Sequence, residues 1–112
     1  MKTELEVDGA AYELVPTISQ DSIGISLIVA IRRGEDRVAQ LHFRCAVDEP
    51  MYQDVDALGA EEMLELILRR GEMANRVRSA LHWQSELERV QPGVISGLIV
   101  PLFPENHSRA RH

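Results

Sequence analysis

The sequence predicts an α+β domain, with an antiparallel sheet of about five strands in the order ββββαβ and one long helix, continuous or kinked, packed on one face of the sheet. Three patterns support this prediction. Residues 3–14 alternate around Asp8-Gly9, residues 23–47 alternate around a second polar turn, and residues 60–91 repeat their apolar positions with helical spacing. A chain of 112 residues that is 45% hydrophobic and 27% charged has room for one core.

The first hairpin is predicted from Asp8-Gly9, the strongest short-range signal for a two-residue turn with positive φ at both positions. Pairing across this turn places Val7 opposite Ala10 and makes one face of the hairpin apolar. The opposite face carries a small acidic group, made up of Glu4, Glu6 and Glu13.

The second hairpin is predicted from odd-numbered apolar positions over residues 23–31 and 39–47, separated by a turn at residues 34–36. With Ile31 opposite Ala39, both apolar rows share one face of the sheet. The other face is mixed, because Ile28 lies there among polar residues. Pro16 is predicted to end the strand before this hairpin, since proline cannot donate to a ladder.

The C-terminal half begins with an acidic connector at residues 47–59, in which Asp56 is placed to help cap the following helix. The helix at residues 60–91 is predicted to stop at Pro92-Gly93. Residues 94–103 are apolar on both faces, which predicts a strand with neighbours on both sides and cover above and below. A single domain over residues 1–103 and a disordered basic tail over residues 104–112 follow from this division.

The predicted helix contains a conflict at Gly71. Its first half centres an apolar face near Leu64 and Leu68, whereas the second half has a stripe turned by roughly a third of a revolution. A kink or break at Gly71 would let both halves face one core. The alternative is a continuous helix with two apolar faces, one of them covered by a second subunit.

Composition excludes several classes of ligand and location. A formal net charge of -6 argues against direct nucleic-acid binding, which needs clustered Lys and Arg. The single cysteine, Cys45, cannot form an internal disulfide, and the first residues lack the apolar core of a signal peptide. The longest apolar run, residues 23–31, is about half of what a membrane helix requires. We therefore expect a cytoplasmic protein with no membrane segment.

No residue pattern predicts catalysis, a cofactor or a metal site. His42 and Cys45 are close in sequence, but a separation of three on a strand places them on opposite faces. Cys45 is expected to be a buried apolar residue and His82 a solvated one on the helix. The acidic connector lacks the glycine and glutamate spacing of a calcium loop.

The remaining features favour protein binding. The predicted interface residues are Trp83, Leu64, Leu68, Glu4, Glu6 and Glu13. We expect a small non-catalytic acidic protein that binds a protein partner, as an adaptor, a chaperone or an inhibitor of the kind mobile elements encode, and that forms a homodimer. The alternatives are an acidic mimic of nucleic acid that blocks a nucleic-acid-binding protein and a small enzyme without a recognisable motif.

Overall fold

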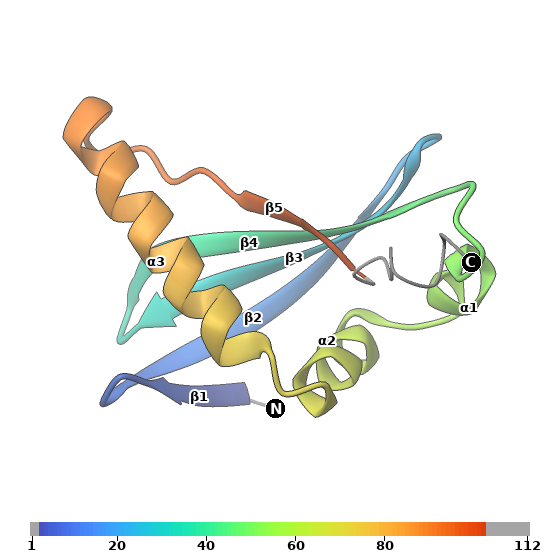
Figure 1. The fold of residues 1–112 in the computed structure, drawn as a ribbon, viewed down its shortest axis with the longest axis horizontal. Helices are drawn as coiled ribbons and strands as arrows, with labels where there is room; N and C mark the ends of the chain where they lie inside the picture. The colour runs from blue at the N-terminus through green and yellow to red at the C-terminus, as the bar shows by residue number, and fades with distance from the viewer. Residues whose placement is uncertain (1–2, 103–112) are drawn as a thin grey trace, which may run out of the picture.

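A computed structural model describes residues 3–102, whose strands form one five-stranded sheet in the order β1-β2-β3-β4-β5 (Figure 1). The elements in chain order are β1 (Thr3–Val7), β2 (Ala10–Gln20), β3 (Gly24–Arg33), β4 (Asp36–Ala46), α1 (Tyr52–Asp56), α2 (Ala60–Arg69), α3 (Met73–Val90) and β5 (Leu98–Pro101). The predicted α+β class and the five strands are confirmed. One continuous long helix is not confirmed, since the segment between β4 and β5 holds three helices, and α2 and α3 divide the predicted helix at Gly71.

The sheet is mixed, and the prediction of a wholly antiparallel sheet fails at its last strand. The pairs β1–β2, β2–β3 and β3–β4 are antiparallel, but β5 runs parallel to β4, with Leu41 opposite Leu98. Short turns force the first four strands to alternate in direction, whereas the three helices before β5 form a crossover long enough for a parallel return.

The first hairpin has the predicted turn and register. Asp8 and Gly9 have φ values of 52° and 85°, and Val7 pairs with Ala10. The predicted strand end at Pro16 is wrong, because β2 continues to Gln20. Pairing with β1 stops at Leu14, so Pro16 lies where β2 pairs with β3 alone, and an edge position tolerates a missing amide hydrogen.

The second hairpin pairs Ile31 with Ala39 as predicted, with a register shift just beyond Ile31. Ile23 and Val47, at the ends of the predicted apolar rows, lie outside the strands and are exposed. Alternate residues of β2, β3 and β4 are buried in the core, namely Tyr12, Leu14, Ile25, Leu27, Val29, Ile31, Ala39, Leu41, Phe43 and Cys45. We call the face that carries them the inner face and the opposite face the outer face.

The two halves of the predicted helix are separate helices joined at Gly71, whose φ is 77°. Both pack on the inner face, where α3 crosses in front of the strands (Figure 1). Leu64 of α2 and Val77 of α3 belong to the same core cluster and are 1% and 0% exposed. A break at Gly71, and not a continuous helix with two apolar faces, therefore resolves the conflict in the sequence.

The acidic connector contains the short helix α1, which was not predicted from the sequence. Asp56 does not cap α2, because its carboxylate accepts a hydrogen bond from Gln20 Nε2 at 2.9 Å. The N-cap of α2 is Gly59, whose N–H donates to Glu62 Oε1 at 2.7 Å. The glutamate in the first turn thus supplies the capping contact.

The last strand is shorter and less covered than predicted. It spans Leu98–Pro101 at the edge of the sheet, and Ile99 is 66% exposed. The expected cover on both faces is absent from the described residues, because the described helices all pack against the inner face. Phe103 and the predicted tail at residues 104–112 lie outside the described part of the chain.

Candidate protein-binding surface

The outer face of the sheet has no helix packed on it within residues 3–102. Each helix instead buries a residue in the inner-face core: Val55 of α1, Leu64 of α2 and Val77 of α3. One outer-face row crosses four strands, with Thr17, Ile28, His42 and Ile99 side by side. Beside β5 this face has an open hollow of about 460 Å³, lined by Arg44, Ala46, Asp48, Glu49, Ile99, Val100 and Pro101.

A second exposed apolar surface lies at the C-terminal end of α3. It consists of Trp83, Val90, Val94 and Ile95, which are 42%, 77%, 42% and 37% exposed, and we call it the α3-end patch. Val90 follows Trp83 by seven residues, so the two side chains share one side of the helix about 10 Å apart. The chain then leaves α3 and runs back toward β5 (Figure 1).

The buried side chain of Gln84 fixes the turn that completes this patch. Its amide nitrogen donates to the carbonyl of Val94, and its amide oxygen accepts from the N–H of Ser96 at 3.4 Å. The same turn is stabilised by the N–H of Gly93, which donates to Glu88 Oε1 at 2.9 Å. These contacts hold Val94 and Ile95 next to α3 without any partner.

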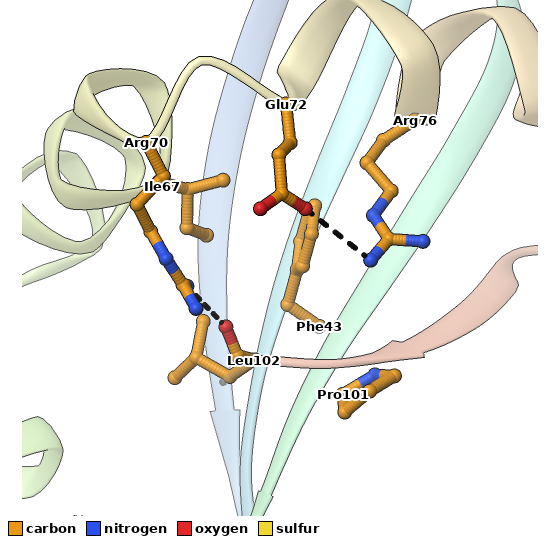
Figure 2. Close-up of a pocket in the computed structure, with 7 residues that line it drawn as sticks. All are labelled: Phe43, Ile67, Arg70, Glu72, Arg76, Pro101 and Leu102. Carbon is orange, nitrogen blue, oxygen red and sulfur yellow. Dashed lines mark hydrogen bonds and ion pairs between the residues drawn. The ribbon is translucent and has the colours of Figure 1, made fainter. Parts of the chain in front are cut away.

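The recess in Figure 2 is too small to be a ligand site. It lies where the α2–α3 junction meets the end of β5 and holds only about 10 Å³, close to the minimum for one water molecule. Arg70 donates to the carbonyl of Leu102 at 2.7 Å, and Glu72 pairs with Arg76 at 3.6 Å. The residues around this recess therefore connect the C-terminal end of β5 to the helices, through the hydrogen bond from Arg70 to Leu102.

His42 and Cys45 lie on opposite faces of β4, as predicted. Cys45 is fully buried, and burial, followed by contact with Glu49, raises the pKa of its thiol to about 11, which suppresses the thiolate. Burial, followed by the charge of Arg44, lowers the pKa of His42. The backbone at Gly97 lies directly against the His42 ring and leaves no space for a Cβ atom.

Among the described residues, no three His, Cys, Asp or Glu side chains lie close enough together to hold a metal ion. No helix in this part of the chain is long and apolar enough to cross a membrane.

The predicted interface residues lie in three different places. Trp83 is exposed on α3, whereas Glu4, Glu6 and Glu13 lie together on the outer face of β1 and β2. Leu64 is buried and Leu68 packs partly against the core, so the reason for predicting Leu64, an uncovered apolar face of the helix, does not hold. Val90, Val94 and Ile95 were not predicted from the sequence, although Val90 follows Trp83 by seven residues and this spacing places both on one side of a helix.

Comparison with known proteins finds no matching family model, no matching curated protein and no matching solved structure.

Proposed function

We propose that this chain is a small non-catalytic protein-binding protein, acting as an adaptor, a chaperone or an inhibitor of a larger protein, and that the α3-end patch contacts its partner. The observation that carries this proposal is the exposure of Trp83 at 42% on the same helix as the exposed Val90, with the exposed Val94 and Ile95 in the turn that Gln84 holds. Exposed apolar residues are common singly, but a group that includes tryptophan is typical of an interface.

The surroundings of the patch resemble those of a binding hot spot. Exposed polar side chains border Trp83, including His82 and the ion pair between Glu86 and Arg89 at 3.2 Å. An apolar centre with a polar rim is the usual anatomy of a protein interface. Because Trp83 lies on a helix and Gln84 holds the adjoining turn, little conformational entropy is lost when a partner binds.

The charge pattern supports protein contact over mimicry of nucleic acid. The acidic residues Glu4 and Glu13 continue, in the same row of the sheet, into Arg32 and Arg37. A polyanion mimic needs an unbroken acidic surface to occupy a basic groove, and the two arginines interrupt this one.

The sole tryptophan of the chain provides a direct test. A partner isolated from the native host on the immobilised chain is titrated into free protein while the emission of Trp83 is recorded. We expect a blue shift as the indole is buried. We also expect Trp83→Ala, followed by calorimetry, to weaken binding by about 30-fold or more, which corresponds to a hot spot of roughly 2 kcal/mol.

The matched control is Ile23→Ala, since Ile23 is 63% exposed in the turn between β2 and β3, away from α3. This control should change affinity by less than about twofold. Raising the salt concentration from about 0.1 M to about 0.5 M should have little effect on an apolar contact. A partner that binds Trp83→Ala as tightly as the parent chain, or whose binding falls steeply with salt, would refute the assignment.

A further inference from the structure

One row of the outer face has an ordered pattern of charge. From β1 to β4 the cross-strand neighbours are Glu4, Glu13, Arg32 and Arg37, paired in that order. The row therefore reads two negative charges followed by two positive ones. Its midpoint lies between β2 and β3.

All four side chains lie on the outer face. Glu13 lies between Tyr12 and Leu14, which are buried on the inner face, and Glu4 is its cross-strand partner. Arg33 is placed over the ring of Tyr12, 6.0 Å from its centroid, so the preceding residue Arg32 points outward. Arg37 pairs with Arg32 and donates to the outward side chain of Gln40 at 3.3 Å.

Two of the three cross-strand pairs in this row bring like charges together within one chain. Glu4 opposes Glu13 and Arg32 opposes Arg37, and like charges directly opposite each other destabilise a sheet. No salt bridge within residues 3–102 involves any of the four; Arg32 instead donates to the carbonyl of Glu35 at 3.1 Å. Glu13 and Arg32 oppose each other across β2 and β3, but Glu4 and Arg37 at the two ends of the row have no opposite charge directly across from them. A second surface with the reversed order of charge would supply an opposite charge to all four residues.

We propose that a second copy of this chain stacks on the outer face, related by a two-fold axis that runs parallel to the strands between β2 and β3. This rotation reverses the row, so that Glu4 faces Arg37 of the other copy and Glu13 faces Arg32, with the reciprocal pairs repeated. The strands of the two sheets remain nearly aligned, which is the common geometry of packed sheets about 10 Å apart.

The apolar part of the outer face fits the same axis. In the next two outer rows, Val15 neighbours Ala30 and Thr17 neighbours Ile28, and each pair spans the boundary between β2 and β3. The rotation places Val15 of one copy on Ala30 of the other, and Ile28 of one copy on Thr17 of the other. Each branched aliphatic side chain therefore meets a smaller side chain across the interface. Such alternation of size lets two faces interdigitate.

The available area matches a stable dimer. With strands about 4.8 Å apart and residues about 3.3 Å apart, five strands of 5, 11, 10, 11 and 4 residues cover roughly 650 Å². A standard interface buries roughly 600–1,000 Å² on each partner, so the face lies within this range. The α3-end patch belongs to the helix layer on the inner face and stays open, so this dimer presents two copies of it.

Variants that reverse the charges of the row test the proposed two-fold axis. Light scattering at about 50 μM should give the parent chain a mass of twice 12.6 kDa. Glu4→Arg with Glu13→Arg makes the row wholly basic, and Arg32→Glu with Arg37→Glu makes it wholly acidic. Each double variant should repel itself and run at 12.6 kDa, whereas an equimolar mixture should return to twice that mass.

Two further variants serve as controls. Glu61→Arg with Glu65→Arg makes the same change of net charge on exposed positions of α2 and should leave the dimer intact. Thr17→Arg, at an exposed position beside the axis, should give a monomer without altering the charge row. Circular dichroism of each variant confirms that it is folded.

Three results would overturn the proposal: a parent chain that stays at 12.6 kDa, double variants that remain dimeric, or a mixture that does not reassociate. Because none of these changes touches Trp83, partner binding by the α3-end patch is tested separately. A monomeric chain that still binds its partner through Trp83 would refute the dimer and leave the proposed function standing.

Discussion

At the scale of single residues, Asp8 links the first hairpin to the helical layer. Its backbone has φ of 52° in the turn, and its carboxylate accepts from Arg78 Nε at 2.9 Å and from Arg78 Nη2 at 3.1 Å. Sequence predicts the turn, because Asp-Gly favours positive φ locally. It does not predict the ion pair, because the partner lies far along the chain and depends on how α3 crosses the sheet.

The charge of Asp8 gives a prediction for stability against pH. The hydrogen bond from Arg78 lowers the pKa of Asp8 below its usual value of 3.8. The ion pair with Arg78 therefore stabilises the folded chain at pH values above 3.8, and this stabilisation is lost as the pH falls through the lower pKa of the folded state. Asp8→Asn, which keeps a residue tolerant of positive φ, should reduce the free energy of unfolding at neutral pH and make no difference in strong acid. Urea titrations of both chains across pH check this, with Asp54→Asn on α1 as control. An equal difference at every pH would contradict it.

At the scale of elements, the strands were easier to predict than their final arrangement. Alternation and a two-residue turn determine the register of the first hairpin, so the opposition of Val7 and Ala10 follows from local sequence. The direction of β5 follows from a crossover of three helices, which leaves no local pattern. The sequence predicted only the acidic half of the charge row, Glu4 and Glu13. The position of Glu13 next to Arg32 depends on the turn at residues 21–23, in which Asp21 Oδ1 accepts a hydrogen bond from the N–H of Ile23 at 2.9 Å.

Gly71 is the element-scale feature at which the sequence left a break and a continuous helix both open, and the break has a φ of 77° that can be tested. A Cβ atom at this position would meet nothing within 4 Å, so a substitution acts through the backbone alone. Gly71→Ala should therefore lower the free energy of unfolding by roughly 1–2 kcal/mol, the cost of a left-handed conformation for an ordinary residue. Gly71→Asn should cost less, because asparagine adopts this conformation more readily. Urea unfolding at one fixed protein concentration measures both, and an Ala variant as stable as the parent would contradict the prediction.

At the scale of the whole molecule, the excess of apolar surface lies elsewhere than the sequence indicated. The mismatch within the helix predicted that Leu64 and Leu68 need a second subunit, but the break at Gly71 turns both helices toward one core. Ile99 is instead uncovered on the outer face and the α3-end patch is uncovered on α3, while Ile23, Val47 and Met51 are exposed in the segments between elements. The outer face belongs to the sheet layer and the α3-end patch to the helix layer. The sequence alone does not show that they are two distinct surfaces. With a second copy on the outer face, the order of layers becomes helix, sheet, sheet, helix.

This layered dimer predicts how thermal stability depends on concentration. If folding is coupled to association through the outer face, each tenfold rise in protein concentration adds about 1.4 kcal/mol to the stability of the dimer. For two chains of 112 residues, this should raise the melting temperature by about 3–5 °C. The variant with Glu4→Arg and Glu13→Arg should melt at one temperature at every concentration, because its wholly basic row prevents stacking. Differential scanning calorimetry over two decades of concentration makes the comparison, and a parent chain whose melting temperature is also constant would show that it folds as an independent monomer.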